Sequence, residues 1–260
     1  MKARLFGIGL ILLLGAAQGC TYGVQTTSGV AYLEKYADLP KNAAALPAKP
    51  GSFSEQLKLA ARVEPVLKFP ARIGLAKLVQ GSLVSIPEKE AGYWEDARAG
   101  LDDDVGDFVL LSPLGMQLAS EAVSADVEKT YYANGAINQI RLAAARQHLD
   151  AVLIYEAVDS FESSRNWLSV LDAALVTLAI LPSRSIASRS SANAILLDVM
   201  QGYHYGSAQA QSKEKRRVSP AVAVDDARKE MAGDVEIEAV RKLSVEVKKM
   251  FNRLLVRTAR

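Results

Sequence analysis

Cysteine and histidine are scarce in this chain, which has one cysteine and two histidines among 260 residues. A single thiol cannot form a disulfide within the chain, and these residues do not supply the ligand set of a structural zinc site. The chain also lacks a G-x-S-x-G nucleophile elbow and, outside its first 19 residues, a glycine loop that would cradle a phosphate. We therefore expect neither a metal nor a cofactor, and we predict a protein that is not an enzyme.

An excess of positive charge is also missing, because 31 basic residues face 29 acidic ones. A chain without residues 1–19 would lack Lys2 and Arg4 and would be formally neutral. Binding to nucleic acid depends on a basic field, so the composition argues against a nucleic-acid partner. Half of the residues are hydrophobic, which is enough for the core of one domain.

The N-terminus has the layout of a secretory signal. Lys2 and Arg4 precede the apolar run Leu5–Leu14, and small residues follow that run. The run is shorter than the roughly 20 apolar residues that span a bilayer. The stretch Ala17-Gln18-Gly19-Cys20 resembles the lipobox of bacterial lipoproteins.

This resemblance implies signal cleavage after Gly19 and lipidation of Cys20, for example with palmitate. Because such a cysteine carries more than one acyl chain, the anchor would be stable. The alternative is ordinary cleavage that leaves Cys20 as a free thiol. In these lipoproteins an Asp after the cysteine often retains the protein at the inner membrane, so Thr21 favours the outer membrane, facing the periplasm.

Composition divides the chain into three segments. Residues 1–19 form the lipoprotein signal peptide, residues 20–51 are predicted to be a flexible tether, and residues 52–260 are predicted to be an α/β periplasmic domain. The tether lacks sustained periodicity and contains helix-breaking prolines at three positions, Pro40, Pro47 and Pro50.

Hydrophobic patterning within 52–260 alternates helices and strands, which is typical of an α/β layered domain. We predict a single domain with a mixed sheet, helices packed on it and a long C-terminal helix. The predicted strands are Ala71–Val79, Phe108–Ser112, Ala151–Val158 and Ala192–Tyr205. The predicted helices are Ser54–Val63, Pro87–Leu101, Ser124–His148 and Val224–Val256, the last with an apolar stripe of Val240, Leu243, Val247, Met250 and Leu254.

Residues 159–191 interrupt this pattern as an insertion between the last two strands. Trp167–Leu181 is strongly apolar, ends at Pro182 and is too short for a membrane-spanning helix. A Ser/Arg loop, Ser183–Ser191, is predicted to follow it. If the apolar segment packs on the sheet it is core, and if it projects it is a partner or membrane contact. Its candidate contact residues are Trp167, Leu171, Leu175 and Leu178.

Three further groups of residues are candidates for binding. Tyr203 and Tyr205 end a predicted strand and are a candidate partner patch, although alternation along the strand explains their spacing equally well. Asp102-Asp103-Asp104 with Asp107 lacks the spacing of a calcium loop, so we expect a solvated turn. The polar segment Gly206–Pro220 is expected to form a solvated tip, whose basic residues are candidates for contact with anionic lipid or polymer: Lys213, Lys215, Arg216 and Arg217.

Three pieces together resemble a known group of proteins: the strand Arg72–Leu78, the passage Arg146–Val158 and the strand with its turn Ala194–Ala208. Their order resembles envelope lipoproteins with an α/β domain like the N-terminal domain of TolB, a group that includes the curli channel lipoprotein and lipoprotein activators of peptidoglycan synthases. The nearer resemblance is to rhombotarget lipoproteins, over roughly Arg72 to Leu255. This resemblance implies a fold that is used for protein contacts, and it implies no catalytic activity for this chain.

The sequence therefore predicts a lipid-anchored envelope protein that acts as a non-enzymatic accessory or assembly module for an envelope protein partner. A first alternative is an oligomeric pore or secretion-complex subunit that uses residues 167–181 as a membrane or partner segment. A second alternative is an envelope hydrolase whose site is not local in sequence.

Overall fold

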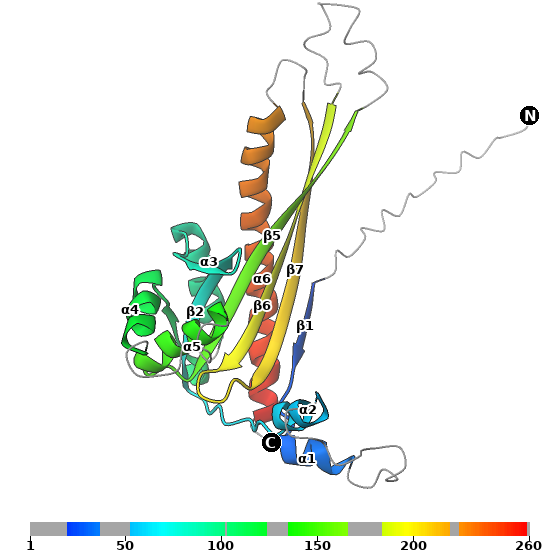
Figure 1. Cartoon of the computed structure of the whole chain (residues 1–260). Helices are drawn as coiled ribbons and strands as arrows, with labels where there is room; N and C mark the ends of the chain where they lie inside the picture. The colour runs from blue at the N-terminus through cyan, green and yellow to red at the C-terminus, as the bar shows by residue number, and fades with distance from the viewer. Residues whose placement is uncertain are drawn as a thin grey trace, which may run out of the picture.

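The computed structural model describes residues 20–36, 53–101, 103–123, 135–165, 184–218 and 224–258. The α/β fold predicted from the sequence is confirmed: one seven-stranded mixed sheet is packed against helices, the last of which is long (Figure 1). The elements in chain order are β1 (Thr21–Val24), α1 (Gly29–Glu34), α2 (Phe53–Ala61), β2 (Ala71–Val79), β3 (Ser82–Val84), α3 (Glu88–Ala99), a 3-10 turn η1 (Asp103–Val105), β4 (Gly106–Leu110), α4 (Pro113–Val123), α5 (Ala136–Arg146), β5 (Ala151–Arg165), β6 (Arg184–Asp198), β7 (His204–Val218) and α6 (Val224–Thr258).

The sheet is built around β2, which is buried on both faces over most of its length. Strand β5 pairs with one edge of β2 in parallel, while β4 and then β3 pair with the other edge. At the start of β4, Gly106 has a φ of 92°, and a Cβ there would meet the backbone of Ala71. Only glycine accepts this conformation readily, so Gly106 allows β4 to enter beside β2.

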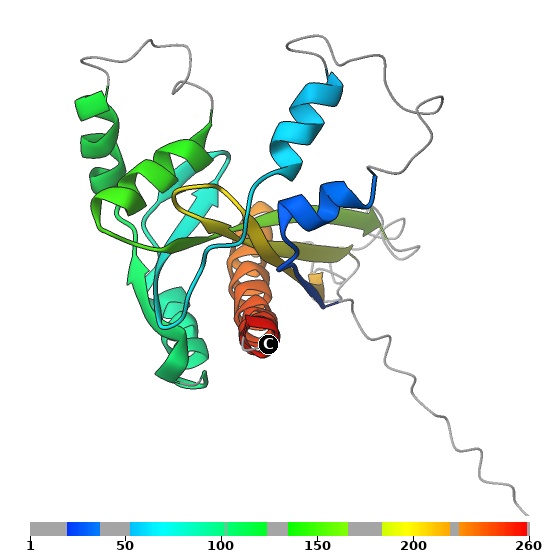
Figure 2. The ribbon, with the colours of Figure 1, turned by 90° about the horizontal axis from the view of Figure 1, so that it is seen from below.

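Two layers of helices enclose the sheet (Figure 2). On one face, α6 buries the predicted stripe Val240 to Leu254 against the inward residues of β5, β6 and β7. On the other face, α5 buries Ile140 and Ala144 against Val152 and Ile154 of β5, with α4 beside it. The prediction that the C-terminal stripe packs on the chain's own sheet is confirmed.

Strands β5, β6 and β7 are each 15 residues long and extend well beyond this core (Figure 1). Their pairing continues to Arg165 opposite Arg184 and to Arg184 opposite Val218. We call the extension the arm; it consists of residues 157–165, 184–192 and 210–218, backed by the first half of α6. The predicted apolar segment Trp167–Leu181 lies outside the described residues, between the ends of β5 and β6.

The arm corrects three predictions. Ser183–Ser191 is not a loop, because Arg184 onward is strand β6, and Gly206–Pro220 is not a polar tip, because it is mostly strand β7. The predicted single strand Ala192–Tyr205 is instead the end of β6, a turn and the start of β7. The reason is that small residues line the face of these strands that meets α6, so the strands lack a hydrophobic signal: Ser188, Ser190, Ala192, Ala210 and Ser212.

The predicted tether is also wrong at its start. Residues Thr21–Val24 form β1, which pairs antiparallel with Gln209 to Gly206 of β7. Helix α1 follows, and Ser28 caps it by accepting a hydrogen bond from the Ala31 amide. Residues 37–52 lie outside the described part of the chain. Cys20 is therefore joined directly to the edge of the sheet.

The region before β5 differs from the prediction as well. Helix α4 was not predicted, and within the predicted helix Ser124–His148 the structure describes only α5, which begins after Gly135. Gly135 has a φ of 139°, which interrupts a helix. Within the described ranges no helix is long and apolar enough to cross a bilayer.

Candidate functional site

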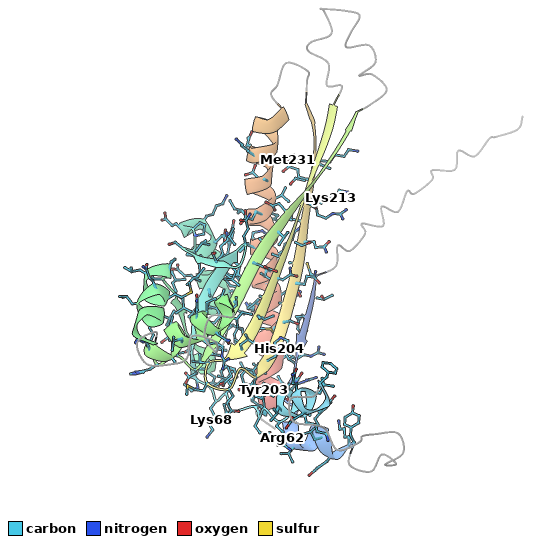
Figure 3. All side chains as sticks on the ribbon, in the orientation of Figure 1. Arg62, Lys68, Tyr203, His204, Lys213 and Met231 are labelled. Carbon is cyan, nitrogen blue, oxygen red and sulfur yellow. The ribbon has the colours of Figure 1, made fainter. Side chains whose placement is uncertain are left out.

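An open surface lies on the face of the arm that points away from α6, which we call the outer face. It is made of three cross-strand rows, the first of which lies at the base of the arm, just before the arm begins: Glu156–Asn193–Gln209, Val158–Ser191–Gln211 and Ser160–Arg189–Lys213. All nine side chains are exposed or half-buried, and Val158 is 56% exposed. Figure 3 labels Lys213 on this part of β7 and Met231 on the early turns of α6. Helices α4 and α5 cover the same face of the sheet only as far as Ile154.

The third row places two cations side by side. Arg189 on β6 and Lys213 on β7 are direct cross-strand partners, and both are exposed. Like charges in this position destabilise a sheet. Lys215, two residues further along β7, is exposed on the same face. Lys213 and Lys215 were predicted to lie on a solvated tip, but in the structure both lie on the surface of a regular strand.

The opposite face carries a buried ionic cluster where the arm leaves the core. The ammonium group of Lys77 on β2 lies 2.6 Å from Oε1 of Glu90 on α3 and 2.8 Å from Oε1 of Glu236 on α6. Tyr155 on β5 donates a hydrogen bond of 2.8 Å to the other oxygen of Glu90, and its ring packs on Trp94. The cluster therefore joins β2, α3, β5 and α6 at one point.

Burial and charge act against each other in this cluster. Burial lowers the pKa of Lys77, but the bonds to Glu236 and Glu90 outweigh it, so the pKa is raised. Burial, together with the Glu90 charge, raises the pKa of Tyr155 above its usual range. Lys77 and Glu90 are only 5% and 2% exposed, so these groups are held in place and lack the access that a substrate would need.

Above the cluster, the contact between the arm and α6 is polar and incompletely bonded. Ser188 and Ser190 are fully buried, and the hydroxyl of Ser188 has no hydrogen-bond partner within the described residues, while Ser190 lies directly opposite Asp159. Burial raises the pKa of Asp159, which lies on the same side of β5. Unpaired buried polar groups cost free energy, so the arm is held to α6 less strongly than the core is.

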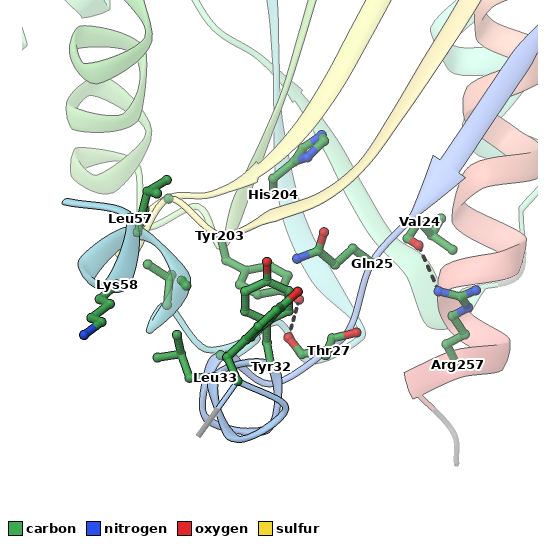
Figure 4. Close-up of a pocket in the computed structure, with 16 residues that line it drawn as sticks. Val24, Gln25, Thr27, Tyr32, Leu33, Leu57, Lys58, Tyr203, His204 and Arg257 are labelled. Atoms are coloured by element: carbon green, nitrogen blue, oxygen red, sulfur yellow. Dashed lines mark hydrogen bonds between the residues drawn. The ribbon is translucent and has the colours of Figure 1, made fainter. Parts of the chain in front are cut away.

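A groove of about 1130 Å³ lies at the other end of the sheet, between α1, α2 and the turn that joins β6 to β7 (Figure 4). Tyr32, Leu33, Leu57 and Tyr203 supply apolar and aromatic walls. The Tyr203 hydroxyl donates a hydrogen bond of 2.7 Å to the Thr27 carbonyl, which fixes one wall. Aromatic walls of this kind suit binding, but the groove is open and has no single charged centre.

The structure buries both tyrosines of the predicted partner patch, so they do not form an exposed patch on the strand, although Tyr203 lines the groove. Tyr203 is 4% exposed and Tyr205 is 1% exposed. The hydroxyl of Tyr205 accepts hydrogen bonds from the amides of Val66 (2.9 Å) and Leu67 (2.7 Å), and burial raises its pKa to about 12. The sequence signal was ambiguous because alternation along a strand does not say which face is covered.

The other predicted residues are placed as follows. Cys20 is half-buried where β1 begins, and it is not bonded to another cysteine. Asp103 and Asp104 form the turn η1, and no group of three or more potential metal ligands occurs in the described ranges. Gly19 and the apolar candidates lie outside these ranges: Trp167, Leu171, Leu175 and Leu178.

Neither a protein-family model nor a curated protein sequence matches the chain. Similar solved structures include the PelC dodecamer from Paraburkholderia phytofirmans, at 12% identity over 69% of this chain and 91% of that one, with a TM-score of 0.27. A minor lipoprotein from Acinetobacter baumannii matches at 8% identity over 73% of this chain and 96% of that one (TM-score 0.31). Lipoprotein GNA1162 from Neisseria meningitidis matches at 14% identity over 64% and 98% of the two chains (TM-score 0.30).

Two of these three neighbours are bacterial lipoproteins by name. Because the identities and TM-scores are low, the likenesses carry no argument about what this chain binds. The resemblance to rhombotarget lipoproteins stays a prediction.

Proposed function

We propose that the protein is a lipid-anchored envelope protein, exposed to the periplasm from the outer membrane, that acts without catalysis by binding another envelope protein. The observation that carries the proposal is the outer face of the arm. It is a regular three-stranded surface, projected from the core on long strands and left open beyond Ile154.

An open face alone is ordinary, because antiparallel sheets often face water on one side. The adjacent cations Arg189 and Lys213 are less ordinary, since they cost stability in the isolated protein. A partner with carboxylates opposite this row would relieve that cost. The exposed Val158 in the neighbouring row adds an apolar contact. The surface therefore suits a folded protein that presents an acidic patch with apolar neighbours.

The second candidate is an oligomeric subunit, and the edges of the arm favour it. Among the described strands, β5 has no neighbour on its outer edge beyond Glu156, and β7 has none beyond Gln209. Unpaired edges can accept a strand from another molecule. Light scattering of the detergent-extracted protein distinguishes the candidates, because a monomer removes this one.

Photocrosslinking in cells tests the first candidate. A photoreactive residue at Arg189 or Gln211 of the lipidated full chain should give an adduct with one envelope protein. The same residue at Glu95, which is exposed on α3 on the other side of the sheet, is the matched control and should not. Identical adducts from all three positions, or none from the arm, would refute the role of the outer face.

The anchor is tested separately. Palmitate labelling and membrane fractionation of the wild type should both be positive, and both should be lost in Cys20→Ala. A wild-type protein that is unlabelled and soluble would remove the lipid anchor from the proposal.

A further inference from the structure

The second half of α6 has a strong excess of positive charge. Residues 241–258 contain six basic residues and one acidic residue, Glu246. Cations near a helix C-terminus interact favourably with the negative end of the helix dipole, which explains some of this excess. It does not explain why four of the six lie on the flank of α6 that faces β1 and the edge of β7.

The contacts of these four cations define the flank. Lys242 donates a hydrogen bond of 3.3 Å to the Gln211 carbonyl, and Arg257 donates one of 2.8 Å to the Val24 carbonyl. The guanidinium of Arg253 stacks over the Tyr22 ring, 5.5 Å from its centroid. All three contacts involve β1 or the strand next to it.

Lys249 is the fourth cation, and it lies within electrostatic reach of Cys20 and Tyr22. Its bond to Glu246, 2.8 Å long, is the main cause of its raised pKa, and Cys20 and Tyr22 add to the effect. Glu246 is 7% exposed at its side chain and Lys249 is 52% exposed, so the cation is the member of the pair that meets solvent.

Two exposed valines lie among the cations. Val245 is 45% exposed and Val256 is 59% exposed. Together with the four cations they recur at steps of three and four along the helix, which places them on one side of α6. We call this set the cationic stripe: Lys242, Val245, Lys249, Arg253, Val256 and Arg257. Basic residues mixed with exposed apolar ones are typical of helices that lie on a membrane surface.

The position of Cys20 brings this surface to the membrane. Thr21, the next residue, is already paired with Gln209 of β7, so no spacer separates an acyl-bearing Cys20 from the sheet. Consecutive Cα atoms are only about 3.8 Å apart. A lipid on Cys20 would therefore hold β1 and the adjoining flank of α6 at the level of the headgroups.

We propose that the cationic stripe is a membrane-contact surface that binds the headgroups of anionic phospholipids beside the anchor. The proposal rests on the lipidation of Cys20 in the proposed function. It fixes the orientation of the domain, because the flank of α6 next to β1 faces the bilayer.

The test uses the full chain with Cys20→Ser, so that the acyl anchor contributes nothing to the measured binding. Flotation is compared on vesicles of phosphatidylcholine alone and of phosphatidylcholine mixed with phosphatidylglycerol. The protein should bind only the mixed vesicles. Lys242→Gln with Lys249→Gln should weaken that binding roughly 30-fold, at the usual value of about 1 kcal/mol per basic residue near an anionic leaflet.

The matched control is Arg241→Gln with Lys248→Gln, which removes the same charge from the opposite flank of the same helix. Lys248 approaches Gly100 and Arg241 pairs with Glu238, so neither touches β1. The control should bind as the parent does, and thermal melting should show that both double variants fold. Equal loss in both variants, or equal binding to both kinds of vesicle, would overturn the proposal. These outcomes do not depend on palmitate labelling, so the anchor and the stripe can fail separately.

Discussion

Replacing Lys77 by methionine should destabilise the protein by about 3–5 kcal/mol, the usual cost of removing one partner of a buried ion pair. Lys77 is 5% exposed and bridges Glu90 at 2.6 Å and Glu236 at 2.8 Å. The side chain of Glu236 is 28% exposed and can be solvated without its partner, whereas that of Glu90 is 2% exposed. Most of the cost should therefore come from the carboxylate of Glu90.

Urea unfolding at neutral pH measures this loss as a lower midpoint at an unchanged slope. The internal comparison is Arg241→Gln, which breaks an exposed ion pair. The side chain of Arg241 is 48% exposed and that of its partner Glu238 is 39% exposed. That variant should lose less than about 1 kcal/mol. Adding Glu90→Gln to Lys77→Met should recover part of the stability, because it removes the isolated charge.

Two outcomes would refute the view that the cluster holds arm and core together. One is a loss below about 1 kcal/mol in Lys77→Met. The other is a double variant, Lys77→Met with Glu90→Gln, that is no more stable than Lys77→Met alone, because the isolated carboxylate would then not be the source of the cost.

Three further predictions concern single side chains. Tyr205→Phe should cost about 2–3 kcal/mol in urea unfolding, because the amides of Val66 and Leu67 lose their acceptor; an unchanged midpoint would contradict this. Asp159→Asn should raise the melting temperature at pH 7 and should have no effect near pH 4. The reason is that burial raises the pKa of Asp159, so the contribution of this group to stability is lost as the pH rises. A gain that is equal at both pH values would show that charge is not the cause. Gly106→Ala should lower the free energy of unfolding by more than about 2 kcal/mol, because alanine at a φ of 92° meets the backbone of Ala71. The control is Gly233→Ala in α6, which has no neighbour near its Cβ and should not lose stability.

The elements with a strong hydrophobic period were predictable. The strand predicted at Ala71–Val79 has the same bounds in the structure, because it is apolar on both faces and lies between Pro70 and a glycine turn. The C-terminal stripe was predictable for the same reason, since a period of 3.6 over many turns has few interpretations. Both elements take their signal from burial in the core.

The arm was not predictable, because its strands meet α6 through serine and alanine and meet water through polar residues. The sequence indicates only one member of the ionic cluster. A lysine within an apolar strand indicates a buried partner, but Glu236 is 159 residues away from Lys77 and carries no local mark. The role of Thr21–Val24 was hidden too, because four residues are too few to show alternation and β7 supplies the pairing.

The continuity of α6 has a mechanical consequence. Its 35 residues contain no proline and form a rod of about 52 Å, at 1.5 Å per residue. One end of this rod backs the arm, and the other end lies along β1, where Arg253 stacks over Tyr22 and Arg257 bonds the Val24 carbonyl. Because one helix contacts both the arm and β1, a force applied to the arm would be transmitted through α6 to the strand that follows Cys20.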